Sequence, residues 1–113
     1  MTARNTLLTA PPYAVEQALK RLGTDLRTAR LRRNLTLQDV AAKIGAGIRA
    51  VSDAERGKPS TSAAVYTAML WALDLLPQLD EVARPERDEE GQMLALGRER
   101  GRARPKAGLS NDF

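Results

Sequence analysis

The stretch from Thr36 to Gly57 limits the folds open to this chain more than any other part of its sequence. Thr36 can cap a helix with its hydroxyl group, and Asp39, three residues later, completes a capping-box pattern and complements the helix dipole. The run Gly45-Ala46-Gly47 interrupts that helix, because glycine costs about 1 kcal/mol relative to alanine in a helix interior. A second helix is predicted over residues 48–56, before the glycine that closes the stretch. The pattern predicts two short helices joined by a tight turn.

Two short helices joined by a glycine-containing turn are typical of the helix-turn-helix motif. Such a motif most often places its second helix in the major groove of DNA. A helical hairpin inside an ordinary bundle is the alternative interpretation. A unit of this size buries too little apolar surface to fold alone, so neighbouring helices must complete its core. We therefore interpret the stretch as a DNA-binding motif within a larger helical domain.

The segment in front of the motif carries apolar residues at helical intervals from position 13 to about position 33. Gly23 lies inside this pattern, and two interpretations fit it. Either one long helix spans the segment, or a helix that belongs to the motif begins near Leu22 and an extra short helix precedes it. We favour the extra helix.

Behind the motif, the run from Ser60 to Ser62 can cap a further helix. A short helix over residues 76–82 is expected to close the domain. We predict that the buried stripe of the longer helix comprises Val65, Ala68, Met69, Ala72, Leu73 and Leu76.

The chain is expected to divide into three parts. Residues 1–12 form an N-terminal arm, residues 13–83 the domain that holds the motif, and residues 84–113 a charged, flexible tail. In the tail an acidic run is followed by a basic run with helix-breaking residues. Only Met93, Leu94 and Leu96 could anchor a turn of helix there.

From Leu22 to Leu76, the sequence resembles the Cro and phage-repressor type of helix-turn-helix protein, the Xre family. The matching residues are Leu26, Ala29, Arg30, Thr36, Val40, Ala41, Val51, Ser52 and the run Glu55-Arg56-Gly57. The resemblance implies an all-α fold, a five-helix lambda-repressor-like DNA-binding domain, here with an N-terminal helical extension and the flexible tail. It also implies binding to double-stranded operator DNA as a homodimer, and transcriptional repression.

The same resemblance implies a structural ion pair. In the resembling family, the arginine that matches Arg30 pairs with the glutamate that matches Glu55, which ties the first helix of the domain to the end of the recognition helix. A partly buried pair of this kind can be bidentate, and it fixes geometry more surely than it adds stability. The alternative is two unrelated surface charges.

Four residues of the second motif helix are candidates for reading DNA bases, because the N-terminal residues of a recognition helix reach base edges. Arg49 is the strongest, since a bidentate contact to guanine is the commonest specific pairing. Ile48 can make apolar contact with a thymine methyl group. Ser52 could equally be a neutral surface residue, and Asp53 could accept a hydrogen bond from cytosine but would be repelled by phosphate.

A second set of residues is placed to hold DNA phosphates. It combines the backbone amides at the start of the first motif helix with polar and basic side chains after the second. The set comprises Leu37, Gln38, Arg56, Lys58, Ser60 and Thr61.

Thr67, Trp71 and Leu75 lie four residues apart on a second face of the helix that follows the motif. Trp71 is the chain's single tryptophan, and tryptophan is enriched at protein interfaces. This face is therefore a candidate surface for homodimerisation or for another partner. Alternatively, the N-terminal extension covers Trp71.

Three stretches also resemble the HipB-like antitoxins, whose partners are HipA-type Ser/Thr kinase toxins. They are LRTARLRRN, LDLLPQLDEVA and PERDEEGQMLAL. This second resemblance implies an antitoxin that neutralises a kinase and represses its own operon. A stand-alone Xre-type dimeric repressor without a toxin is the alternative.

The amino-acid composition excludes several classes of function. The chain has no Cys and no His, which removes the usual zinc sites and the Ser-His and Cys-His catalytic arrangements, so we expect no enzyme activity, metal or cofactor. The formal net charge of +4 gives mild support to a nucleic-acid partner. The longest apolar run is too short to cross a bilayer and no signal-peptide pattern is present, so we expect a cytoplasmic location.

Overall fold

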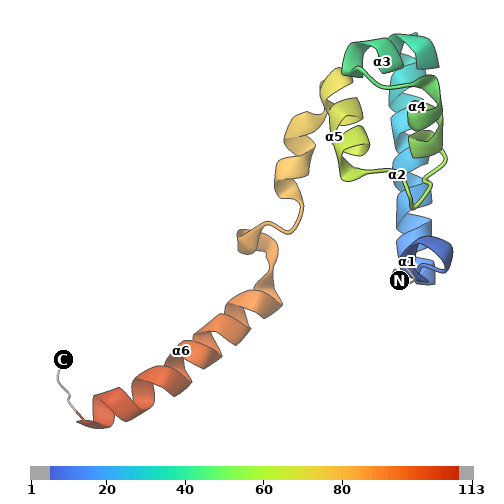
Figure 1. The fold of residues 1–113 in the computed structure, drawn as a ribbon. Coiled ribbons are helices and arrows are strands. Elements are labelled where there is room, and N and C mark those ends of the chain that lie inside the picture. The colour runs from blue at the N-terminus through green and yellow to red at the C-terminus, as the bar shows by residue number, and fades with distance from the viewer. Residues whose placement is uncertain (1–5, 110–113) are drawn as a thin grey trace. The chain divides into compact units, whose positions relative to one another are not determined.

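The computed structural model describes residues 6–109, with side chains through Arg102. Within these residues every regular element is a helix, which confirms the predicted all-α class (Figure 1). The chain contacts divide into two compact units, one up to Leu79 and one from Asp80 onward. The described residues contain no helix that is both long and apolar enough to cross a membrane.

The first unit contains α1 (Thr6–Thr9), α2 (Tyr13–Arg32), α3 (Leu37–Ile44), α4 (Ile48–Glu55) and α5 (Ala63–Ala72). The boundary between the units falls within the 3-10 helix η1 (Leu76–Glu81). The long helix α2 packs against α4, while α3 and α5 pack against each other and against α4. The buried core comprises Leu26, Val40, Ala41, Val51, Ala54, Tyr66, Met69, Ala72 and Leu73. Helix α4 is therefore held from three sides.

Helix α2 is one continuous helix, so the preferred interpretation with a break in this segment is wrong. Gly23 lies within it because α4 ends against this position. A Cβ atom there would lie 2.6 Å from the carbonyl oxygens of both Ala54 and Glu55. Gly57 meets the same face of α2 one turn earlier, where a Cβ atom on Gly57 would lie 2.4 Å from the carbonyl oxygen of Leu19. The two glycines let the backbones approach closely, which outweighs the low helix propensity of Gly23.

The buried face of α5 differs in part from the predicted stripe. Met69, Ala72 and Leu73 are buried as predicted. The other three predicted residues, Val65, Ala68 and Leu76, are only partly buried. Tyr66 was not predicted as a core residue, yet it is buried, and its hydroxyl group donates to the carbonyl oxygen of Lys58 at 3.4 Å.

The second unit contains the 3-10 helix η2 (Pro85–Arg87) and the helix α6 (Glu89–Leu109), which pack against each other. The sequence predicts at most one helical turn near Met93, so α6 is much longer than predicted. Its start has a capping interaction, in which the carboxylate of Asp88 accepts the backbone N–H of Gly91 at 3.0 Å. Acidic residues in the first turn also complement the helix dipole.

Candidate nucleic-acid interface

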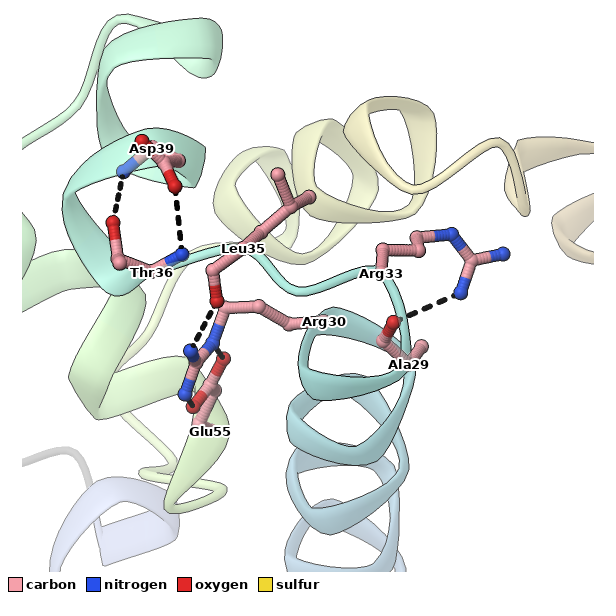
Figure 2. A network of polar contacts seen from close by, with 7 residues as sticks. All are labelled: Ala29, Arg30, Arg33, Leu35, Thr36, Asp39 and Glu55. Carbon is pink, nitrogen blue, oxygen red and sulfur yellow. Dashed lines mark hydrogen bonds and ion pairs between the residues drawn. The ribbon is translucent and has the colours of Figure 1, made fainter.

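Helix α3 begins with the predicted capping box. The hydroxyl oxygen of Thr36 accepts the backbone N–H of Asp39 at 3.0 Å, and the Asp39 carboxylate accepts the backbone N–H of Thr36 at 2.8 Å (Figure 2). The hydrogen bond from the Thr36 backbone N–H, and then the Thr36 side chain, lower the pKa of the Asp39 carboxyl group. The capping box leaves the N–H groups of Leu37 and Gln38 without an acceptor in the described chain, as expected for the first residues of a helix. The start of α3 can therefore receive an anion.

The turn between α3 and α4 depends on the backbone of Gly45. This residue caps α3 in the left-handed conformation, with φ of 73°, where glycine has no steric penalty. Gly47 then precedes α4 in an extended conformation and provides no side-chain cap. The chain thus turns sharply from one motif helix to the next within three residues, as the sequence predicts.

The expected ion pair between Arg30 and Glu55 is present and bidentate. The Nε atom of Arg30 donates to one carboxylate oxygen of Glu55 at 2.6 Å, and an Nη atom donates to the other at 2.9 Å (Figure 2). The remaining Nη atom donates to the carbonyl oxygen of Leu35 at 2.8 Å. Both charged residues are buried, and the hydrogen bonds from Arg30 to Glu55 raise the pKa of the guanidinium group. The pair joins the end of α2, the start of α3 and the end of α4.

The first residues of α4 face solvent. Ile48 is 44% exposed, and Arg49 is exposed and forms no hydrogen bond or ion pair with another described residue. A surface hollow of about 510 Å³ lies between the end of α2 and the starts of α3 and α4, and is lined among others by Gln38 and Ile48. The free amides of α3 and the exposed start of α4 therefore border the same hollow.

A match to known sequences now identifies the domain. A family model described as "Helix-turn-helix domain" matches residues 21–84, which is more than half of the chain. The chain belongs to the helix-turn-helix domain family. Comparisons with curated proteins and with solved structures gave no match.

The later residues of α4 in this helix-turn-helix domain are less free than its start. Ser52 and Asp53 are half-buried. The carboxylate of Asp53 forms ion pairs with Arg56 at 2.5 Å and with Lys58 at 3.7 Å. The predicted roles of these three residues did not include this pairing, although the spacing of Asp53 and Arg56 by three positions on a helix is a signal for it.

The loop after α4 offers fewer phosphate contacts than expected. Arg56, Lys58 and Ser60 are exposed at the end of the helix-turn-helix motif. The hydroxyl oxygen of Thr61, in contrast, is buried, so this side chain is not presented to a phosphate. Its backbone N–H donates to the carbonyl oxygen of Lys58 and helps to close the loop.

On α5 of the helix-turn-helix domain, Trp71 is 51% exposed, so the described part of the N-terminal extension does not cover it. The Nζ atom of Lys43 lies 5.5 Å from the centre of the indole ring and donates to the carbonyl oxygen of Ala72 at 3.3 Å. This cation–π contact was not predicted from the sequence. Thr67 and Leu75 beside it are half-buried. The tryptophan is thus oriented by Lys43 and still accessible.

Proposed function

We propose that this protein is a sequence-specific DNA-binding transcriptional repressor. The observation that supports this most strongly is the shared hollow, where the exposed start of α4 and the free amides of α3 meet. In the proposed complex α4 enters the major groove with Ile48 and Arg49 foremost, and the N–H groups of Leu37 and Gln38 bind a backbone phosphate.

Arg49 has the chemistry for specific recognition. Its guanidinium group has no partner among the described residues, so binding DNA would break no existing interaction of this side chain. A bidentate contact to guanine O6 and N7 discriminates against other bases by about 1–3 kcal/mol. Ile48 would contact a thymine methyl group. Ser52, one turn further along, would contact a base only if α4 lies deep in the groove.

For Asp53 a supporting role is better founded than base reading. Its carboxylate already binds Arg56 and Lys58, and a free carboxylate would repel DNA. We infer that Asp53 orients these two cations for contact with phosphates. Together with Ser60, they would hold the backbone near the end of α4.

We further propose that the protein acts as a homodimer through the surface of Thr67, Trp71 and Leu75. A two-fold protein of this class reads two half-sites about 34 Å apart, or one turn of DNA.

Selection of bound duplexes from a random-sequence pool is the direct test of the function. We expect an enriched inverted repeat with this spacing, and a pool with no enriched motif would exclude sequence-specific recognition.

Replacing Trp71 with alanine is expected to weaken dimer formation about 30-fold, because a buried aromatic anchor at an interface contributes about 2 kcal/mol or more. Sedimentation equilibrium measures the dissociation constant. Tyr13→Ala is the matched control, since it removes another exposed aromatic side chain from α2. A dimer that is equally strong in both variants would place the interface elsewhere.

The antitoxin hypothesis rests on short stretches of sequence resemblance, and the domain match fits an antitoxin and a stand-alone repressor equally. A stand-alone repressor requires only the domain and a dimer surface. A HipB-like antitoxin would also bind a HipA-type kinase, encoded beside it. Co-expression with such a neighbouring gene product, followed by size-exclusion chromatography, separates the two: a stable complex supports the antitoxin, and separate elution supports the stand-alone repressor.

A further inference from the structure

One short segment of α6 is strongly basic. Residues 98–106 contain five basic residues and one acidic residue, a net charge of +4. This equals the formal net charge of the whole chain, so the 13 basic and 13 acidic residues outside the segment cancel. A basic segment of this kind attracts a polyanion.

The arginines of this segment are available for binding. Arg98, Arg100 and Arg102 are exposed, and none forms a hydrogen bond or ion pair with another described residue. Arginines elsewhere in the same unit differ. Arg84 binds Glu81 and Glu86, and Arg87 binds Glu81. The second unit thus contains one pair of neutralised arginines and one set without partners.

Helical spacing places the available arginines on two opposite flanks. Successive residues of an α-helix are about 100° apart, so Arg98 and Arg102 share one side and Arg100 lies roughly 200° from Arg98. Gly97 and Gly101 fall on the face between these flanks. Nothing lies within 4 Å of the Cβ position of either glycine. Two positions one turn apart on this face, 97 and 101, therefore carry no side chain, and arginines border them on both sides.

This arrangement is complementary to the major groove of DNA. The groove is about 12 Å wide, and an α-helix is about 10–12 Å in diameter. A helix in the groove has a phosphate strand along each flank, while the face between the flanks approaches the base edges. Glycine on that face permits a close approach.

We propose that α6 is a second DNA-binding element, in which Arg98, Arg100 and Arg102 contact phosphates on both strands. The contact is confined to the C-terminal half of α6, because Glu89 and Glu90 in its first turn repel phosphate. This inference rests on the proposed DNA-binding function. The phosphate contacts of α6 add affinity that does not depend on the DNA sequence.

The test measures how binding depends on salt. The full chain, an Arg98→Gln/Arg100→Gln variant and an Arg84→Gln/Arg87→Gln control are titrated with a random-sequence DNA duplex by fluorescence anisotropy over a range of NaCl concentrations. Both variants lose two positive charges from the same unit. Each phosphate contact contributes about 0.9 to the slope of log K against log [NaCl], so the α6 variant should lose about 1.8 and the control should keep the slope of the full chain.

The outcomes separate this inference from the proposed function. The inference is overturned if the full chain binds DNA and both variants keep its salt slope, or if both variants lower that slope by the same amount. In either case α6 makes no specific phosphate contact. If the full chain binds no duplex at any salt concentration, the proposed function fails as well. Selection experiments with the α6 variant should return the same sequence motif as the full chain, because the lost contacts read no bases.

Discussion

Replacing Glu55 with alanine is expected to lower the free energy of unfolding by about 3–5 kcal/mol. The change removes both acceptors of the Arg30 guanidinium group and leaves a buried charge without its partner. Arg30 is only 6% exposed, so water cannot replace the lost carboxylate without opening the junction of α2, α3 and α4. Urea denaturation followed by circular dichroism measures the effect. A loss below about 0.5 kcal/mol, which is usual for a surface substitution, would contradict it.

The double substitution Arg30→Met with Glu55→Leu is the informative control. Replacing both members of a buried ion pair with apolar side chains of similar size is often nearly neutral. We therefore expect the double variant to recover most of the stability lost by Glu55→Ala. The carbonyl oxygen of Leu35 still loses its donor, which costs about 1–3 kcal/mol. A double variant less stable than the single one would mean that the pair itself contributes net stability.

Replacing Gly57 with alanine is expected to cost about 2–5 kcal/mol, the second largest effect. Gly57 has φ of 69°, and a side chain in this conformation costs about 1–2 kcal/mol. The added Cβ atom would also lie 2.4 Å from the carbonyl oxygen of Leu19, which forces α2 and the end of α4 apart. Overpacking of this kind costs about 1–3 kcal/mol more. Urea denaturation again provides the measurement.

Gly45→Ala separates the two causes. Gly45 also has positive φ, at 73°, but nothing lies within 4 Å of its Cβ position. The free energy of unfolding of Gly45→Ala should therefore fall only by the cost of the left-handed conformation, about 1–2 kcal/mol. Equal losses at Gly45 and Gly57 would show that α2 and α4 are not in close backbone contact.

The motif could be predicted because its determinants are local. Helix α3 begins at the capping box of Thr36 and Asp39 and ends at the left-handed Gly45. These residues lie within a few positions of the helix ends that they define. The exposed start of α4 is likewise defined by residues next to it in the sequence. The pairing of Arg30 with Glu55 spans 25 positions, and only resemblance to a family suggested it.

The errors arose where distant residues decide the structure. Local propensity at Gly23 weighs against a continuous helix, but the contact of this residue with the end of α4 selects glycine inside one. The predicted stripe of α5 does not include Tyr66, which is buried with its hydroxyl group on a partner in a loop, the carbonyl group of Lys58. The length of α6 was underestimated because its glycines and proline weigh against a helix in local propensity.

In the candidate site, too, features set by neighbouring residues could be predicted and contacts between side chains could not. Helical position alone placed Ile48 and Arg49 at an exposed helix start. It did not show that Asp53 is bound to Arg56 and Lys58, or that Lys43 stacks on Trp71, because both depend on side-chain directions. A residue's type and spacing thus indicate where it lies more reliably than which partner it has.

Base preference of Arg49 variants tests most directly whether the start of α4 reads DNA. Selection from a random pool is compared for the full chain, Arg49→Ala and Arg49→Lys, which keeps the charge but loses the bidentate geometry. We predict that both variants lose discrimination at one position of each half-site, by about 1–3 kcal/mol, and keep it elsewhere. An unchanged motif in Arg49→Ala, with affinity lowered equally on all sequences and restored by lysine, would contradict base reading and make Arg49 a phosphate contact.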